Sequence, residues 1–237
     1  ATTSTSLRLH AGFTTTSITS SESGNVTGTT GNDLIQGGNG DNTLNGGNGN
    51  DLIYGGNGND TLDGGNGNDV LFGGTGNDTI YGGNGSDRII GGAGNDNLYA
   101  GSNATSDNTV DVFVWSLGDQ GVGGAPAVDT IYGFGSAAAN TNNGGDVLDL
   151  RDLLQGESSG PLNGAGNLAD YLHFEVTGGS TIVHISHTGG YAGGGFNGAQ
   201  TTQQIVLSGV DLQTLYSTTS DQQIITQLLN NNKLITD

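Results

Sequence analysis

The sequence predicts an all-β fold, in which a coil of short parallel strands is followed by a β-rich cap with a few short helices. Glycine makes up 47 of the 237 residues, far above ordinary usage. Between Gly28 and Tyr99 the chain repeats itself every nine residues, and from Ala100 onward this register is lost and the composition becomes more apolar. We therefore expect a lead-in segment over residues 1–27, the coil over residues 28–112 and the cap over residues 113–237.

Charge and composition exclude several classes of function. The formal net charge is −19 with only four basic residues, which makes nucleic acid an implausible partner. Cysteine is absent, so neither disulfides nor thiolate metal sites can form. No apolar run approaches the roughly 20 residues of a membrane helix. The first residues lack the apolar segment of a signal peptide. We interpret the chain as a monomer or as part of a larger chain.

Eight nine-residue units follow one another from Gly28 to Tyr99. The eighth position of each unit is always aliphatic, as at Ile53 and Leu62. The sixth position is aspartate in seven of the eight units, and in the second unit Asn42 takes its place. These aspartates are the main candidate metal ligands: Asp33, Asp51, Asp60, Asp69, Asp78, Asp87 and Asp96.

The chemistry of one unit predicts its shape. Six residues of glycine, asparagine and aspartate form a tight turn, because these residues tolerate positive φ and bond to their own backbone. The remaining three residues form a short strand in which only the aliphatic side chain points inward. Two strands then complete one turn of the coil in 18 residues, so aspartates 18 apart stack at roughly 4.8 Å. A flexible glycine-rich linker, the alternative, does not explain the fixed eighth position.

Stacked carboxylates repel one another, and a divalent cation between the turns removes this conflict. Calcium accepts six to eight oxygen ligands from carboxylates and backbone carbonyls in flexible geometry, and a glycine turn supplies both kinds of oxygen. Magnesium fits less well, because it demands a tighter octahedral geometry and retains its water. The sequence therefore predicts that calcium ions complete the interior of the coil.

The units match the pattern GGxGxDxUx, where U is aliphatic, and they resemble the RTX (repeats-in-toxin) nonapeptides of proteins exported by bacterial type I secretion systems. The resemblance implies a right-handed parallel β-roll that holds about five or six calcium ions. Each ion would lie between turns two units apart. The first turn would supply its Asp and the carbonyls of positions 2 and 4, and the second turn would supply its Asp and the carbonyls of positions 1 and 3. The implied carbonyl ligands are Gly31, Gly46, Gly47, Asn48, Gly49, Gly56, Gly58, Gly64, Gly65, Asn66, Gly67, Gly73, Gly74, Thr75, Gly76, Gly82, Asn84, Gly91 and Ala93.

The implied aspartate pairs are 33/51, 51/69, 60/78, 69/87 and 78/96. The pair 42/60 is a weaker site, because Asn42 offers only an amide oxygen.

Residues 129–154 contain a second pattern, D-x-I-x-x-F followed by DVLDL and LL. It resembles the C-terminal region of large RTX adhesins, where it precedes a β-rich cap and an uncleaved secretion signal. Outside the repeats, weaker candidate calcium ligands are Asp107, Asp129, Asp146 and Asp149, with loop or helix capping as the alternative role.

The second half also contains signals for individual elements. Residues 174–188 predict a β-hairpin around a Gly-Gly turn, and residues 203–212 predict another strand. Residues 220–232 predict an amphipathic helix with Ser220 as N-cap and Gln223 completing a capping box. A short helix over residues 150–154 is expected after Asp149 as its cap.

Catalytic motifs are nearly absent, and we expect no enzyme activity. Residues 156–160, GESSG, fit the pattern of a serine nucleophile, but a nucleophile elbow follows a strand and opens a helix, whereas here a helix-like stretch precedes and Pro161 follows. His184 and His187 are separated by an odd number of residues in a strand, which places them on opposite faces as half-exposed residues.

The function implied by these resemblances is a non-enzymatic, calcium-dependent folding and secretion module at the C-terminus of a surface adhesin. Its partner would be the type I secretion machinery, and it would reside outside the cell or on the bacterial surface. One alternative is the RTX tail of a secreted lipase, protease or epimerase whose catalytic domain lies upstream. The other is an ice-binding module, which requires threonine at the third position, where only Thr30 and Thr75 occur.

The outward side chains differ between odd and even units. Odd units present apolar pairs such as Leu52/Tyr54 and Val70/Phe72, whereas even units present threonine with polar or tyrosine side chains. Because soluble monomers seldom expose a large apolar patch, we expect another element to cover the apolar face.

Overall fold

Two nine-stranded sheets run the length of the protein, one in the order β1-β2-β4-β6-β8-β10-β12-β14-β18 and the other in the order β15-β16-β17-β13-β11-β9-β7-β5-β3. A computed structural model describes residues 5–9, 13–17, 24–103, 107–121, 123–135, 145–154, 168–191 and 195–236. The strands are β1 (Thr5–Leu9), β2 (Phe13–Ser17), β3 (Asn25–Thr27), β4 (Asp33–Gln36), β5 (Thr43–Asn48), β6 (Leu52–Asn57), β7 (Thr61–Asn66), β8 (Val70–Thr75), β9 (Thr79–Asn84), β10 (Arg88–Ala93), β11 (Asn97–Tyr99), β12 (Val112–Val114), β13 (Ala127–Tyr132), β14 (Val147–Asp149), β15 (Leu172–Thr177), β16 (Ser180–Ile185), β17 (Gln203–Leu207) and β18 (Leu234–Ile235). The helices are η1 (Leu168–Asp170), η2 (Gly198–Gln200), α1 (Leu212–Tyr216) and α2 (Asp221–Asn230).

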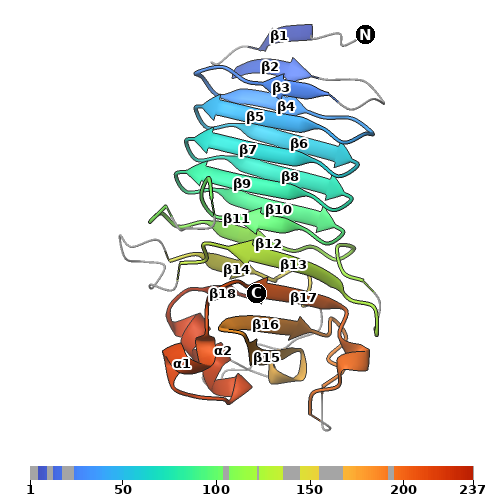
Figure 1. The fold of residues 1–237 in the computed structure, drawn as a ribbon, viewed down its shortest axis with the longest axis vertical. Coiled ribbons are helices and arrows are strands. Elements are labelled where there is room, and N and C mark those ends of the chain that lie inside the picture. Colours follow the sequence, from blue (N-terminus) through green and yellow to red (C-terminus); the bar gives the residue numbers. More distant parts are fainter. Residues whose placement is uncertain are drawn as a thin grey trace.

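The repeats form a parallel β-roll, as the sequence predicts. Successive units alternate between the two sheets, and strands two units apart pair in parallel with an offset of 18 residues, as at Ile53↔Leu71. Figure 1 shows these strands stacked along the long axis of the molecule. Most of the repeat strands contain six residues and not the three expected, because the first half of each glycine turn also pairs, as at Gly47↔Gly65. Glycine is required there: a Cβ on Gly67, whose φ is +138°, would lie 1.7 Å from the Gly49 carbonyl oxygen.

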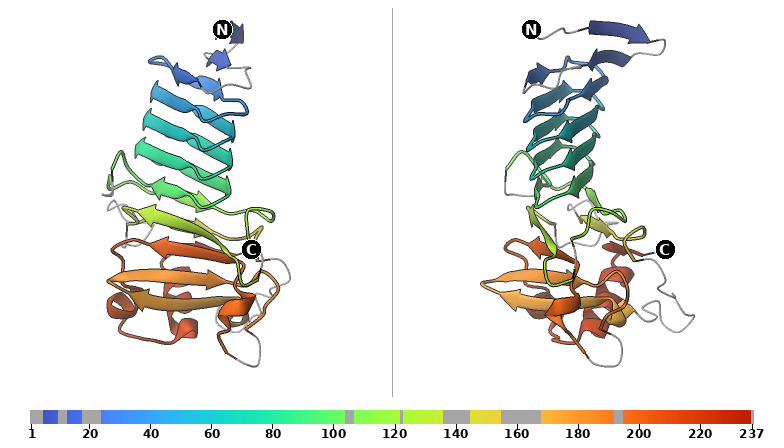
Figure 2. Two further views of the ribbon diagram at one scale, coloured as in Figure 1. Left: turned by 45° about the vertical axis from the view of Figure 1, so that its right-hand side comes forward. Right: turned by 90° about the vertical axis from the view of Figure 1, so that its right-hand side faces the viewer.

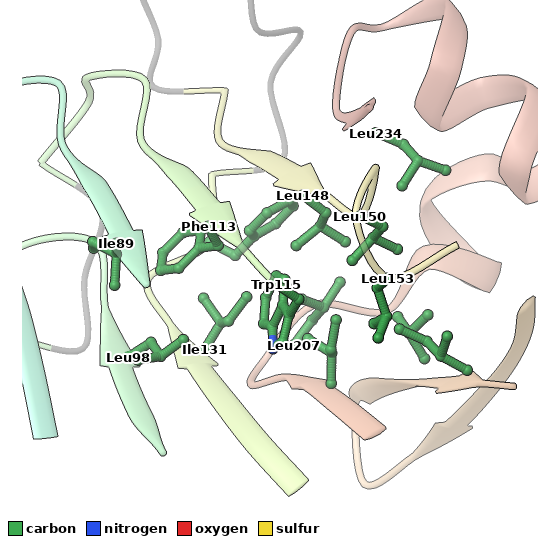
Figure 3. Packing of buried hydrophobic residues seen from close by; sticks show 14 of the residues in the cluster. Ile89, Leu98, Phe113, Trp115, Ile131, Leu148, Leu150, Leu153, Leu207 and Leu234 are labelled. Atoms are coloured by element: carbon green, nitrogen blue, oxygen red, sulfur yellow. The ribbon is translucent and has the colours of Figure 1, made fainter. Parts of the chain in front are cut away.

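A single column of apolar side chains fills the roll. The inward aliphatic residue of every unit is completely buried, from Ile35 to Leu98. The column continues into the second half of the chain through Phe113, Ile131 and Leu148, which Figure 3 shows packed in sequence beyond Ile89 and Leu98. The hydrophobic core is therefore continuous between the repeats and the cap.

Both sheets also extend past residue 112. β12 pairs in parallel with β10, β14 with β12 and β18 with β14, while β13 pairs with β11 and β17 with β13. The hairpin β15–β16 adds to the second sheet, and its two turn glycines, Gly178 and Gly179, have φ of +59° and +78°. The helices α1 and α2 lie at this end, opposite β1 and β2 (Figures 1 and 2). The division of roll and cap into separate domains stays a prediction.

Several details of the second half differ from the expectations. Residues 151–154 form a turn and no helix. Asp149 pairs with two arginine side chains and also accepts from the Arg151 amide at 3.4 Å. The residue at the N-cap of α2 is Ser220, but its side chain makes no capping hydrogen bond. The predicted capping box does not form, since the Gln223 side chain accepts from the Thr218 hydroxyl and the Ser220 amide donates to Thr218 Oγ1. The predicted helix itself is present, with Ile224, Ile225 and Leu228 buried. None of the helices in the described parts of the chain is long and apolar enough to cross a membrane.

Among the described residues, no element outside the roll covers the apolar outer face. Tyr54 and Phe72 are half-buried, as are Asp63 and Tyr81 on the opposite sheet. Their rings stack on each other, with centroids 4.7 Å apart. The expected cover by another part of this chain is therefore not found among the described residues, where ring stacking along the sheet shields part of each side chain from water.

Candidate metal centre

Hydrogen bonds link the aspartates of the roll into two ladders, one at each edge where the turns stack. The amide of Asp51 donates to Asp69 Oδ1 at 2.7 Å, and the amide of Asp69 donates to Asp87 Oδ1 at 2.8 Å. In the other ladder the amide of Asp60 donates to Asp78 Oδ1 at 2.7 Å, and the pattern continues to Asp96 at 2.8 Å. One oxygen of each of these carboxylates is thus fixed by the preceding turn, whereas Asp33 accepts from Thr29 of its own turn.

The second carboxylate oxygen of each repeat aspartate has no hydrogen-bond partner. All seven repeat aspartates are at most 2% exposed. The unpartnered buried oxygens are Asp33 Oδ1 and the Oδ2 atoms of Asp51, Asp60, Asp69, Asp78, Asp87 and Asp96. A buried anionic oxygen without a donor is strongly unfavourable, so this row of atoms calls for bound cations.

Burial perturbs the acidity of these groups in the same direction. It raises the pKa of Asp69 to about 6, that of Asp78 to about 7 and that of Asp87 to about 8. The hydrogen bond from the preceding aspartate's amide opposes this rise, and the neighbouring carboxylates add to it. The folded roll therefore resists holding these carboxylates charged unless a cation neutralises them.

The glycine turns bring carbonyl oxygens to the free carboxylate oxygens. A Cβ built on Gly64 would lie 2.4 Å from Asp69 Oδ2 and 2.4 Å from the Gly82 carbonyl oxygen. A Cβ on Gly46 would meet Asp51 Oδ2 at 2.3 Å and the Gly64 carbonyl at 2.5 Å. The carboxylate of one turn and the first carbonyl of the next turn therefore face the same small space, which no side chain could enter.

These donors fit a calcium ion. Within the described residues no three acidic or histidine side chains converge on one point, so an ion between two turns must take carbonyl oxygens in addition to two carboxylates. A mixture of carboxylate and carbonyl oxygens is what calcium prefers. The ligand sets implied by the sequence stay predictions, and the structure brings together the free aspartate oxygens and the position-one carbonyls that they require.

Asn42 occupies the ladder position that lacks a carboxylate. Its amide N–H donates to Asp60 Oδ1 at 2.7 Å, as an aspartate would. Its side-chain nitrogen donates to the Gly40 carbonyl, and its Oδ1 is buried without a partner. This oxygen remains free for a cation, although it carries no charge.

Beyond the repeats, protein groups occupy both oxygens of two further ladder aspartates, Asp129 and Asp146. Asp129 Oδ1 accepts from the Asp96 amide, and its Oδ2 accepts from Trp115 Nε1 at 2.6 Å and Gln203 Nε2 at 2.8 Å. Asp146 Oδ1 accepts from the Asp111 amide at 3.0 Å, and its Oδ2 accepts from the Gly135 amide at 2.6 Å.

A lysine and two arginines also contact carbonyl and carboxylate oxygens at this end of the roll. The buried ammonium group of Lys233 donates to the carbonyls of Gly135 and Asp146. Arg151 binds the carboxylate of Asp149, with Nη2 and Oδ2 2.7 Å apart, and Arg88 lies 3.6 Å from the same oxygen. Protein donors thus satisfy Asp129, Asp146 and Asp149, which the sequence offered as weaker candidate ligands.

One buried ladder aspartate, Asp111, was missed by the sequence reasoning. Its Oδ1 accepts from the Asp87 amide at 2.8 Å, and its Oδ2 has no partner. The signal that could have found it is the tripeptide Asp111-Val112-Phe113, which matches the D-x-U strand of the nonapeptides when a phenylalanine is allowed at the aliphatic position. The weaker candidate Asp107 lies in the same turn, where it accepts from the Gly85 amide at 3.0 Å.

Of the residues considered for catalysis, the structure describes only the two histidines. Residues 156–160 lie outside the described residues. His184 is buried and not half-exposed as expected, because the hairpin places it between Glu175, at 3.1 Å from Nε2, and Gln204, at 3.2 Å from Nδ1. His187 instead lies 3.0 Å from the Thr202 hydroxyl. The expectation that both histidines lie in one strand was wrong, because β16 ends at Ile185 and His187 lies in the turn that follows.

Comparison with known proteins identifies the type of the repeats. Residues 27–62 and 63–98 each match the family model of the RTX calcium-binding nonapeptide repeat (4 copies). No curated protein matches the chain. One similar solved structure is the solution structure of the AlgE6R3 subunit from the Azotobacter vinelandii mannuronan C5-epimerase, with 21% identity, coverage of 79% of this chain and 71% of that chain, and a TM-score of 0.32. Residues 27–98 are therefore RTX calcium-binding nonapeptide repeats, which are typical of extracellular proteins exported by type I secretion.

Proposed function

We propose that this chain is a non-enzymatic module that folds on binding calcium and assists export through a type I secretion system. The observation that carries this proposal is the row of buried, unpartnered carboxylate oxygens in both ladders. Without cations the folded roll would hold these anions away from water and close to one another. Metal binding and folding are then one equilibrium, because the ligands come together only in the folded roll.

Calcium would act as the switch between the two sides of the membrane. Where calcium is scarce, charge repulsion keeps the repeats unfolded, which suits passage through a narrow channel. Extracellular calcium modules bind with Kd of about 10⁻⁴–10⁻³ M, so external calcium would fold the emerging chain. Folding outside the cell would then hinder the chain from sliding back.

The parent protein in this proposal is a large surface adhesin, with this module at its C-terminus. The support is the second motif, D-x-I-x-x-F followed by DVLDL, which lies where both sheets extend beyond the repeats. Asp129 is on β13, Asp149 is on β14 and Asp146 directly precedes β14. The tail of a secreted enzyme would share the calcium-dependent roll and would differ in what lies upstream.

A secretion assay tests the proposal. The chain is fused behind a reporter protein in bacteria that carry a type I secretion system, and the reporter is measured in the medium with and without external calcium. We expect more export with calcium, and no export from cells that lack the secretion system. A variant with asparagine in place of Asp60, Asp69 and Asp78 should lose the calcium response. Export that is independent of both calcium and the secretion system would refute the proposal.

A further inference from the structure

The turn that leads into β12 departs from the nine-residue repeat and nevertheless continues the aspartate ladder. Asp111 follows Asp87 by 24 residues where the repeats have 18, so this turn contains six additional residues. The strand after it keeps the register of the roll, with Val112 opposite Arg88 and Phe113 opposite Ile89. The matched repeat region ends at residue 98, so this turn lies outside it.

Two buried carboxylate oxygens on successive turns of this ladder have no partners. Asp87 Oδ2 and Asp111 Oδ2 are both unpartnered, and Asp111 is completely buried. The amide of Asp87 donates to Asp111 Oδ1 at 2.8 Å, the same distance as from the Asp69 amide to Asp87. Asp111 therefore holds the same position toward Asp87 as a repeat aspartate holds toward the one before it.

The carbonyl that a calcium ion would need is also in place. A Cβ built on Gly82 would lie 2.5 Å from the Ala100 carbonyl oxygen and 2.6 Å from Asp87 Oδ2. In the repeat turns the corresponding contacts are with a glycine carbonyl, as at Gly64 with Gly82. Ala100 thus supplies the position-one carbonyl before the inserted residues begin.

A third carboxylate stands beside these groups. The Gly85 amide donates to Asp107 Oδ2 at 3.0 Å, whereas the equivalent Gly67 amide donates to the Asn84 carbonyl at 2.8 Å. The amide of Thr109 fixes Asp107 by donating to its Oδ1 at 2.9 Å. A charged oxygen therefore occupies the place of a neutral backbone carbonyl. The carboxylates of Asp87, Asp107 and Asp111 do not converge on one point, so Asp107 contributes its charge and not a direct ligand.

We propose that Asp87, Asp111 and the Ala100 carbonyl form an additional calcium site outside the nonapeptide repeats, and that the charge of Asp107 strengthens it. This inference rests on the proposed calcium-dependent folding of the roll. Calcium affinity rises with the number of negative charges at a site, and this site has one more than a repeat site. It is also the last site of its ladder, because both oxygens of the next aspartate, Asp146, accept hydrogen bonds from backbone amides. The ion would therefore join the repeats to the cap.

Equilibrium dialysis of the whole chain against calcium chloride tests this site by counting bound ions. Asp111→Asn retains an oxygen to accept the Asp87 amide and removes the charge. We expect it to bind one ion fewer at the calcium concentration that saturates the unaltered chain. Asp119→Asn is the matched control, because Asp119 lies in the following loop and accepts from the Ser116 amide at 2.7 Å. The control should bind the full number of ions, and a loss of one ion there as well would overturn the inference.

A second variant keeps the test decisive if Asp111→Asn fails to fold. Asp107→Asn alters a half-buried loop residue and retains the acceptor for the Gly85 amide. It should bind the full number of ions, one of them with affinity reduced by roughly tenfold. Unchanged affinities in Asp107→Asn, or an unchanged ion count in a folded Asp111→Asn, would overturn the site while leaving calcium-dependent folding intact. An unaltered chain that binds no calcium would instead refute the proposed function.

Discussion

Replacing Asp69 with asparagine should raise the calcium concentration that folds the roll. Asp69 lies between Asp51 and Asp87 in its ladder, so its carboxylate belongs to two predicted ion sites. Asparagine has nearly the same shape and retains an oxygen to accept the Asp51 amide, now bonded at 2.7 Å. The change therefore removes the charge and avoids the roughly 1–3 kcal/mol that an unsatisfied buried amide would cost.

The expected magnitude follows from the number of ions that share this side chain. An ion that binds only the folded state stabilises it by about 2.7 kcal/mol when its free concentration is about 100 times its Kd. Abolishing the two ions next to Asp69 would remove about 5 kcal/mol under that condition. Small domains have a total free energy of unfolding of about 5–15 kcal/mol. The variant should thus stay unfolded at calcium concentrations that fold the unaltered chain.

A calcium titration followed by far-ultraviolet circular dichroism measures the effect as a shift in the folding midpoint. Asp63→Asn is the matched control, because it makes the same chemical change on the outward face of β7, where Asp63 accepts from Asn45 Nδ2 at 2.9 Å. The control should fold close to the midpoint of the unaltered chain. Equal midpoints for Asp69→Asn and Asp63→Asn would refute the shared role of Asp69.

Three further changes test other parts of the roll. Asn42→Asp should lower the calcium midpoint, because it supplies the missing carboxylate opposite Asp60; an unchanged midpoint would argue against a site there. In chelator, stability against denaturant should rise as the pH falls. Burial raises the pKa of ladder carboxyls above 3.8 in the folded state, to about 8 for Asp87. Their contribution to stability is therefore present at low pH and is lost as the pH rises through the folded-state pKa. Stability independent of pH would contradict this. Leu71→Ala, at a completely buried position, should lower the free energy of unfolding in saturating calcium by about 2–5 kcal/mol. Val70→Ala, at a half-buried position, should lower it by clearly less. Equal losses would contradict the assignment of Leu71 to the core.

The repeats were predictable because their period is a property of the sequence itself. The aliphatic eighth position, as at Leu71, predicts the buried column, and the aspartate at position six predicts the ladder. The same reasoning stopped at Asp111, because the inserted residues break the nine-residue period although the D-x-U strand remains. A search for that tripeptide at irregular spacing would have found Asp111, Asp129 and Asp146 together.

The contacts at the end of the two aspartate ladders could not be predicted from the sequence, for a different reason. Asp129 bonds to Gln203, which is 74 residues away in the chain, and Lys233 reaches the Gly135 carbonyl across 98 residues. No local sequence pattern predicts such contacts, because only the folded cap brings these distant residues together. For the same reason the burial of His184 between Glu175 and Gln204 was not foreseen.

The most direct measurement of calcium-dependent folding is the circular dichroism of the whole chain in chelator, followed by titration with calcium and separately with magnesium. The buried, unpartnered oxygens of residues such as Asp69 and Asp78 predict a largely disordered chain in chelator near neutral pH and a cooperative gain of β signal with calcium. Magnesium should be a poor substitute, because the turns offer carbonyl and carboxylate oxygens in a geometry that it accepts reluctantly. The same β signal in chelator and in calcium would show that the roll does not need the metal.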